Sequence, residues 1–459
     1  MVEAVTGSGK TRLALEAAKR LRKAINQRLY TVVVVPTITL MDQWYSETEK
    51  FFGTDQQYLI GRLGDGHQDD FSRPRCSMII AVAPSAANHV NNLLAFARNG
   101  NVQTLIIADE VHRLIYAEQH GRVLDYPFTY TLGMSATLDK ERDDRIGRRF
   151  YRFTFEDAKR DGIIPDFDLV QVAVSLNSQE RREYEQLTDQ LQDQFKLVKG
   201  LYATELKGID EVKLEWRLLR ELSRIQRRTS DPQIGRLFGQ LFRRAAISHK
   251  CEQKIQLAKQ LGHFFIHQQG RGKRIFFFER IQSAVEIEDT VEDRSVTDSF
   301  QEVADTLHAI DPDAWCKTVQ SGLNTKDRRR ILDEFRSSAV ATLLCCRMLD
   351  EGLNVPEIDV AVLVSSSQTK RQRIQRIGRA LRRSSEGKRP LVISFYVSET
   401  TDANTIKYDH ELFAGVATIH SVSKESLINH VQELSAPRQT KLVPRASTCS
   451  PEPISATLV

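Results

Sequence analysis

Short apolar runs alternate with stretches of helical periodicity through the first third of the chain. Thr31–Val35, Met78–Ala83 and Thr104–Ala108 consist mostly of β-branched or other apolar residues, and each leads into a polar or proline-containing loop. Strands that are apolar at nearly every position are typical of a parallel sheet with helices on both faces. A helix is also predicted over Thr11–Arg22. The alternation predicts a doubly wound α/β domain.

The segment 178–262 has the periodicity of amphipathic helices. Between Trp216 and Lys250, basic residues far outnumber the acidic Glu221 and Asp231. Two interpretations remain open: a helical arm along a nucleic-acid backbone, or a solvated helix face. The first apolar stripe comprises Tyr184, Leu187, Leu191, Phe195 and Val198, and the second comprises Ile209, Val212, Trp216, Leu219 and Leu222.

The strand pattern returns in the second half, which predicts a second α/β domain. We expect a first domain over residues 1–158, a linker over 159–167 and a second domain over 168–434 that includes the helical insertion 178–262. The tail 435–459 is rich in Pro, Ser and Thr, and we expect it to be disordered. The predicted strands are Asp168–Leu176, Ile275–Phe278, Ala341–Cys345, Val360–Val364 and Pro390–Phe395.

Composition narrows the class of protein. The chain has 459 residues, 41% of them hydrophobic, which suits two or three globular domains. Its net charge of +5 is mild, so a polyanionic partner would need a local basic face. The six cysteines form no C-x-x-C pair, which indicates buried thiols in a reducing compartment. Because no apolar run approaches the ~18 residues of a membrane span and no leader is evident, we expect a cytoplasmic protein without a membrane partner.

The segment Ala4–Thr11 has the pattern of a phosphate-binding loop. Gly7 and Gly9 allow the backbone to wrap around phosphate oxygens, and the following helix adds its positive end. Lys10 is expected to contact the β- and γ-phosphates, and the Thr11 hydroxyl to ligate Mg²⁺. The alternative is a glycine-rich turn before a helix. The residues assigned to the nucleotide are Thr6, Gly7, Ser8, Gly9, Lys10 and Thr11.

An acidic pair follows the strand Thr104–Ala108, at the edge where doubly wound sheets bind ligands. We expect Asp109 to hold Mg²⁺ through water, and Glu110 to orient and deprotonate the attacking water. His112 is a candidate for connecting this site to the other domain. In isolation such a pair could also be a helix cap.

Taken together, these segments resemble the superfamily 2 helicases and translocases of the DEAD/DEAH-box (DExH) type. The chain is most similar to the branch that holds type III restriction subunits and repair helicases. The resemblance covers residues 1 to about 400 and rests on motifs in a fixed order. It implies two RecA-like doubly wound parallel-sheet domains with a helical insertion, and ATP bound with Mg²⁺ in the cleft between them.

The resemblance assigns further residues. Ser135 and Thr137 match the motif that couples hydrolysis to strand contact, and Gly352 and Asn354 lie in a fifth motif that contacts the nucleotide. In the sixth motif Gln375 is catalytic, and Arg379 and Arg382 are the expected arginine fingers. The expected nucleic-acid contacts are Pro36, Thr37, Ser85, Ser321 and Gly322.

Simpler interpretations of three of these motifs stay open. Trp44, in the segment that touches the nucleic acid, can be a core aromatic residue instead of stacking on a base. Ser135–Thr137 can be a turn of small residues, and Lys370–Arg383 can be a solvated basic helix.

The implied function is an ATP-dependent helicase or translocase on nucleic acid, on DNA more than RNA, moving from 3′ to 5′. Two alternatives remain: a duplex-DNA translocase subunit of a restriction or defence complex that does not separate strands, and a nucleic-acid-binding remnant without hydrolysis. The resemblance also leaves room for a partner subunit in a restriction, defence or repair complex. Three departures from the family are Ala4, where the full motif has Gly, Asn354, where many members have Asp, and the short Met1–Val5 segment, where members carry an adenine-binding element.

Overall fold

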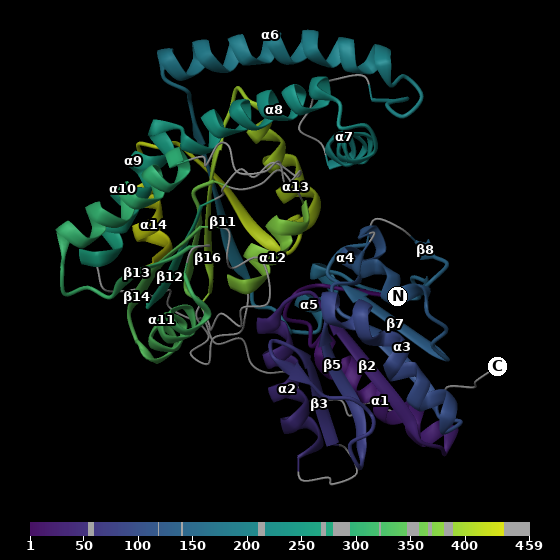
Figure 1. Ribbon diagram of the computed structural model, residues 1–459. Helices are drawn as coiled ribbons and strands as arrows, with labels where there is room; N and C mark the ends of the chain where they lie inside the picture. Colours follow the sequence, from purple (N-terminus) through teal and green to yellow (C-terminus); the bar gives the residue numbers. More distant parts are fainter. Residues whose placement is uncertain are drawn as a thin grey trace.

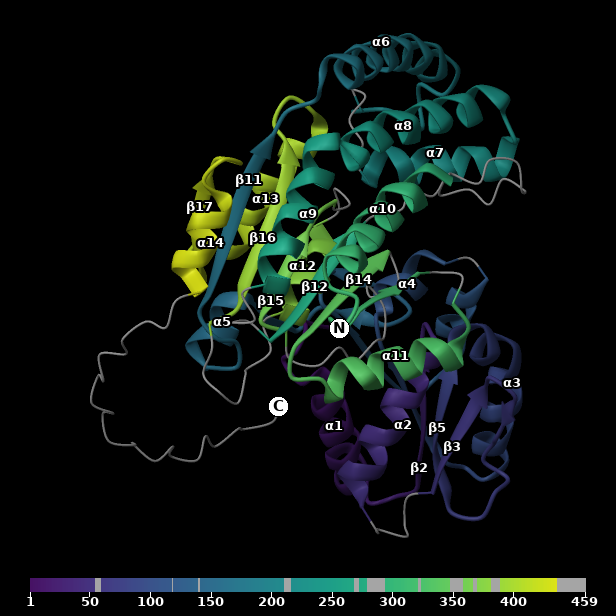
Figure 2. The same ribbon diagram turned by 90° about the vertical axis from the view of Figure 1, so that its left-hand side faces the viewer.

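Two parallel β-sheets, one in each half of the chain, form the framework of the protein (Figure 1). The computed structural model describes residues 1–53, 59–117, 119–138, 141–209, 216–267, 272–278, 294–320, 323–346, 358–365, 370–380 and 389–435. Both sheets carry helices on their two faces, and a group of longer helices extends from the second one (Figures 1 and 2). The predicted fold class, two parallel-sheet α/β domains, is confirmed.

The first sheet has the strand order β10-β1-β7-β6-β2-β5-β3-β4, and all its pairs are parallel except β3 with β4. Along β2, Val32 and Val34 pack on one face, and Val33 and Val35 pack on the other. Every side chain of β2 is therefore buried, which explains its continuous apolar run. The strands are β1 (Val2–Ala4), β2 (Leu29–Val35), β3 (Leu59–Gly64), β4 (His67–Gln68), β5 (Cys76–Val82), β6 (Gln103–Ala108), β7 (Tyr130–Ser135) and β10 (Tyr151–Phe153).

Helices cover both faces of this sheet. Residues of α1 (Lys10–Ile25) and α2 (Ile38–Phe52) pack with Val33 and Val35. Residues of α3 (Ala83–Asn99) and α4 (Val111–Tyr116) pack on the opposite face. A 3₁₀ helix, η1 (His120–Asp125), and a two-stranded hairpin of β8 (Arg142–Asp143) and β9 (Gly147–Arg148) complete this half.

The second sheet is entirely parallel, with the order β13-β14-β12-β15-β16-β11-β17. Cys345 and Cys346 belong to the cores on opposite faces of it, as predicted for neighbours in a strand. The strands are β11 (Phe167–Val174), β12 (Lys273–Phe278), β13 (Cys316–Val319), β14 (Ala341–Cys346), β15 (Val360–Leu363), β16 (Leu391–Val397) and β17 (Ala417–Val422).

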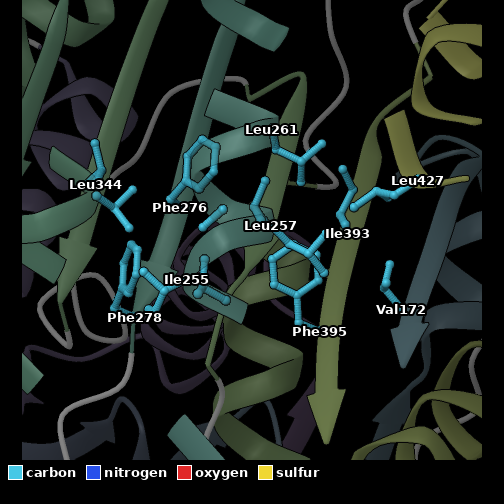
Figure 3. Packing of buried hydrophobic residues seen from close by; sticks show 14 of the residues in the cluster. Val172, Ile255, Leu257, Leu261, Phe276, Phe278, Leu344, Ile393, Phe395 and Leu427 are labelled. Carbon is cyan, nitrogen blue, oxygen red and sulfur yellow. The ribbon is translucent and has the colours of Figure 1, made fainter. Parts of the chain in front are cut away.

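Helices pack on both faces of the second sheet. On one face lie α9 (Glu252–His267), α10 (Arg294–Ile310) and α14 (Leu427–Ser435). Figure 3 shows Leu261 and Leu427 of these helices in one cluster with Phe276, Ile393 and Phe395 of the strands. On the other face lie α11 (Thr325–Ser337), α12 (Lys370–Ala380) and α13 (Asn404–Phe413), the last preceded by a 3₁₀ turn, η3 (Thr401–Ala403).

Most of the predicted helical insertion 178–262 forms a core of its own. This core joins α6 (Ser178–Leu201), α7 (Trp216–Thr229) and α8 (Pro232–Lys250), which lie at the top of Figure 1. The last part of the predicted insertion, residues 252–262, instead belongs to α9 and packs on the second sheet. The first predicted stripe is confirmed: Tyr184, Leu191, Phe195 and Val198 are buried, and Leu187 packs beside them. Of the second stripe, Ile209 and Leu222 are buried. Val212 and the side chains of Trp216 and Leu219 lie outside the described part of the chain.

A short helix, α5 (Phe155–Arg160), connects the two sheets. Its Phe155 and Ala158 belong to a core cluster with strands of the second sheet, and the Phe155 ring lies 5.0 Å from that of Phe413. The predicted linker 159–167 thus begins inside a packed helix and ends at the first residue of β11. The predicted domain limits remain predictions, and the tail beyond Ser435 lies outside the described residues.

The same cluster joins the two halves of the protein. Val5 and Ala136, which follow strands of the first sheet, pack with Ile374 and Ile377 of α12. Among the described helices, none combines the length and the apolar character needed to cross a membrane.

Candidate nucleotide-binding site

The phosphate-loop segment connects β1 directly to α1, as predicted. Gly7 and Gly9 have φ values of 82° and 83°, in the left-handed region that disfavours residues with a Cβ. Lys10 Nζ donates hydrogen bonds to the carbonyl oxygens of Ala4 (3.0 Å) and Val5 (3.3 Å). The loop is therefore a tight turn at the start of a helix with no acidic residue in its first turn, which suits an anion.

Asp109 lies at the carboxyl end of β6 and is almost completely buried. Its Oδ2 accepts a hydrogen bond from Trp44 Nε1 (2.8 Å), and its Oδ1 accepts one from the backbone N–H of Glu110 (2.9 Å). Burial, and after it the negative charge of Glu110, raises the pKa of Asp109 to about 6. Trp44 is fully buried, so the core interpretation of Trp44 is confirmed and base stacking is wrong.

Glu110 adopts a φ of 45°, which is uncommon for a residue with a side chain. Its Oε2 lies 3.3 Å from His112 Nδ1. Burial by itself raises the pKa of Glu110, but the hydrogen bond with His112 and the charge of Lys10 outweigh it and lower the pKa to about 2. Glu110 is therefore held as an anion beside the phosphate loop.

The three predicted coupling residues form one hydrogen-bonded group. His112 Nδ1 lies 2.8 Å from Ser135 Oγ, and Ser135 Oγ donates to the carbonyl oxygen of Thr137 (2.8 Å). Ser135 Oγ also lies 3.5 Å from Glu110 Oε2. These bonds connect the acidic pair to the loop after β7. Since they all stay within the first half of the protein, the predicted link from His112 to the other domain remains a prediction.

The sixth-motif helix, α12, touches the phosphate loop. A Cβ on Gly378 would lie 1.7 Å from Thr6 Oγ1, and Thr6 Oγ1 donates a 3.5 Å hydrogen bond to the carbonyl oxygen of Ile374. Segments about 370 residues apart in sequence are therefore in direct contact. Gln375 is buried in this helix near the loop.

The described arginines of α12 contradict the solvated-helix interpretation. Arg373 and Arg376 are each 1% exposed. Arg376 Nη1 donates to the carbonyl oxygen of Ser365 (3.3 Å). The burial of Arg373 was missed because its partner, Asp409, lies 36 residues downstream.

Several predicted residues fall outside the described chain. The side chain of Arg379 is not described, although its backbone continues α12 directly after Gly378. The remaining ones are Arg382, Gly352, Asn354, Ser321 and Gly322.

The predicted nucleic-acid contacts that are described lie at one edge of the first sheet. Pro36 and Thr37 follow β2, and Ser85 lies in the first turn of α3 after β5. Because β2 and β5 are parallel neighbours, both segments emerge at the same edge. Thr37 also caps α2, since its Oγ1 accepts a hydrogen bond from the backbone N–H of Leu40 (3.3 Å).

Two family models match the chain. One, described as "Type III restriction enzyme, res subunit", matches residues 1–140, and the other, "Helicase conserved C-terminal domain", matches residues 253–384. A protein of Sulfurisphaera tokodaii named DNA 3'-5' translocase XPB2 is 26% identical over 405 residues, which cover 86% of this chain and 77% of that protein. DNA 3'-5' helicase XPB of Mycobacterium tuberculosis is 31% identical over 100 residues, 22% of this chain and 18% of that protein.

Solved structures are similar in fold. S. cerevisiae Dbp5 bound to RNA and ADP BeF3 superimposes with a TM-score of 0.52 at 12% identity, covering 95% of this chain and 89% of that one. The type ISP restriction-modification enzyme LlaBIII bound to DNA gives a TM-score of 0.54 at 12% identity, covering 94% of this chain and 31% of that one. At this identity the likeness concerns the fold alone.

Proposed function

We propose that this chain, which belongs to the superfamily 2 helicases related to the type III restriction and repair branch, uses ATP to move along DNA from 3′ to 5′. ATP-dependent action on nucleic acid follows from the family. The choice of DNA and of direction is supported by the relative named DNA 3'-5' translocase, which aligns over 86% of the chain. The observation that carries the proposal is the contact between Gly378 and Thr6, which brings the sixth-motif helix onto the phosphate loop.

The phosphate loop is proposed to hold the triphosphate. Backbone N–H groups of the loop and the positive end of α1 would bind the anion, and Lys10 would exchange its carbonyl partners for phosphate oxygens. Thr11 and Asp109 would hold Mg²⁺, which neutralises charge on the phosphates when it is bound. The described residues contain no cluster of three metal-ligating side chains, which suits an ion that takes most ligands from phosphate and water.

Glu110 is proposed to orient the attacking water. Its low pKa keeps it ionised at neutral pH, so it can accept a hydrogen bond from water at all times. A loose phosphoryl-transfer transition state demands positioning more than strong basicity, so a weakly basic carboxylate is sufficient. The bonds of His112 with Glu110 and Ser135 then connect the position of the water to Thr137 at the sheet edge.

Gln375 and the arginines that follow it are proposed to complete the site from the second half. Arg379 follows Gly378 along α12, so closure of the two halves would bring it to the γ-phosphate, together with Arg382. Arginine fingers of this kind raise phosphoryl-transfer rates by on the order of 10³–10⁵. Gly352 and Asn354 keep their assignment to the nucleotide by resemblance.

Nucleic acid is proposed to cross the carboxyl edge of the first sheet at Pro36, Thr37 and Ser85, and to continue to Ser321 and Gly322. Contacts to the backbone would make binding insensitive to sequence and sensitive to salt. A second candidate, translocation on duplex DNA without strand separation, is favoured by the restriction-subunit match over residues 1–140. A partner subunit of a restriction or repair complex would fit either candidate.

The test is the rate of phosphate release by the purified chain with no polymer, single-stranded DNA, duplex DNA or RNA. We expect stimulation by DNA above that by RNA, and loss of turnover in Lys10→Ala with salt-sensitive DNA binding retained. Absence of turnover with every polymer would overturn the proposal in favour of a binding protein. Strand-displacement and triplex-displacement assays, run side by side, separate unwinding from translocation.

A further inference from the structure

Arg373 of α12 is buried in an ion pair that the proposed ATPase site does not use. Its guanidinium Nε and Nη2 contact the two carboxylate oxygens of Asp409 on α13. Nη2 also donates to Ser394 Oγ of β16 (2.8 Å), and Gln171 Nε2 of β11 donates to Asp409 Oδ2 (3.0 Å). The pair therefore ties α12 to a second helix and to two neighbouring strands of the sheet.

Such a pair is better suited to fixing geometry than to increasing stability. Removing two charges from water is unfavourable, and their attraction offsets this only with well-formed hydrogen bonds. A planar guanidinium that engages both carboxylate oxygens restricts the direction as well as the distance of its partner. Arg373 thus sets the orientation of α12 relative to α13.

The orientation of α12 matters because the helix approaches the phosphate loop closely at Gly378. Gly378 lies five residues after Arg373, about 7.5 Å further along the axis. At that point a single added carbon would overlap Thr6 Oγ1. A small tilt of α12 about Arg373 would therefore either break the contact of Gly378 with Thr6 or cause a steric clash there. It would also displace the backbone at Arg379.

We propose that Arg373 is a positioning residue, whose bidentate pair with Asp409 holds α12 at the angle that brings Gly378 against Thr6 of the phosphate loop. This role rests on the proposed ATPase function. It predicts that the pair affects the chemical step and leaves nucleotide affinity nearly unchanged.

A second buried ion pair supplies a matched control. Lys254 Nζ of α9 lies 2.5 Å from Asp402 Oδ2 of η3, and both residues are at most 2% exposed. Lys254→Met removes the partner on α9, which packs on the opposite face of the second sheet from α12, and leaves Asp402 its hydrogen bond from the backbone N–H of Val397 (2.9 Å). This variant should therefore cost stability without tilting α12.

The experiment compares Arg373→Lys and Asp409→Asn with Lys254→Met in the full chain. We expect kcat for ATP to fall about 10²-fold in the first two, as misplacement by ~1 Å can cause, with KM within about twofold of the original. Hydrogen–deuterium exchange should rise at residues 4–10 and 370–380 in both. Lys254→Met should lose thermal stability yet keep kcat and the exchange of these two segments.

Each outcome decides the matter. If all three variants lose kcat in proportion to their loss of melting temperature, Arg373 is merely structural and the inference fails. If the original chain does not hydrolyse ATP, the proposed function fails. The positioning role is tested separately: it is overturned if hydrogen–deuterium exchange of residues 4–10 is unchanged in Asp409→Asn. Should Arg373→Lys not fold, Ser394→Ala, which removes one hydrogen bond from Nη2, must give the same pattern at smaller amplitude.

Discussion

At the scale of single residues, the acidic pair shows how neighbouring carboxyl groups acquire different properties. The pKa of Asp109 is raised by burial, whereas that of Glu110 is lowered because its hydrogen bond with His112 and nearby positive charges outweigh burial. One carboxyl group thus titrates near the physiological range, and the other stays ionised. This division suits a metal-holding group beside a water-orienting group.

The first residue-scale prediction concerns Glu110. Glu110→Gln should bind ATP and DNA normally but lower the rate of hydrolysis by on the order of 10²–10⁴, because an amide cannot accept the water's proton. Single-turnover phosphate release measures the chemical step, and a fluorescent nucleotide measures binding. Glu156→Gln, at an exposed position of α5, is the matched control. Hydrolysis at the original rate would remove Glu110 from the mechanism.

The second residue-scale prediction concerns the pH dependence of the metal site. The carboxyl group of Asp109 must lose its proton to hold Mg²⁺, so activity at low magnesium should decline as pH falls through about 6. The hydrogen bond from Trp44 lowers this pKa, and Trp44→Phe should therefore move the acid limb of kcat/KM to higher pH. If the acid limb of kcat/KM lies at the same pH in Trp44→Phe, the hydrogen bond from Trp44 does not affect the group whose titration limits activity.

At the scale of elements, the contact of α12 with the phosphate loop determines which substitutions the helix tolerates. Gly→Ala within a helix normally adds about 0.8–1.0 kcal/mol of stability. At Gly378 the new carbon would instead overlap Thr6 Oγ1, so we expect Gly378→Ala to displace the helix and abolish most ATPase activity. Gly200→Ala in α6, where no atom lies within 4 Å of the added carbon, should be neutral or slightly stabilising. Comparable turnover and melting temperature in the two variants would contradict this prediction.

The elements themselves were largely predictable, and their contacts were not. The predicted runs match β2, β5 and β6, each of which begins one or two residues earlier. These strands could be recognised from the sequence because strands buried on both faces are apolar at nearly every position. Periodicity could not reveal that the arginines of α12 are buried, because Asp409 follows only after a further strand. Likewise, the bond between Trp44 and Asp109 joins residues 65 positions apart. Motif order predicted which segments meet, and only the fold determines which atoms do.

At the scale of the whole molecule, an apolar cluster holds the two halves together at the proposed nucleotide site. Val5 follows β1 at the phosphate loop, and Ala136 follows β7 beside the coupling serine; both pack with Ile374 and Ile377 of α12. The segments that would sense phosphate and nucleic acid thus belong to the same apolar cluster as the helix that would supply arginine. Closure and catalysis should therefore depend on the same small contact area.

This dependence gives the last prediction. Ala136→Asp places a charge in the apolar cluster, where an unpaired carboxylate is strongly disfavoured, so the two halves should separate while each sheet remains folded. Small-angle X-ray scattering should show a larger radius of gyration with an ATP analogue and DNA present. ATP hydrolysis should fall more steeply than nucleotide binding, because the phosphate loop survives in the open form. Ala203→Asp, at an exposed position, should change neither. If Ala136→Asp remains compact and active, catalysis does not depend on the apolar cluster between the two halves.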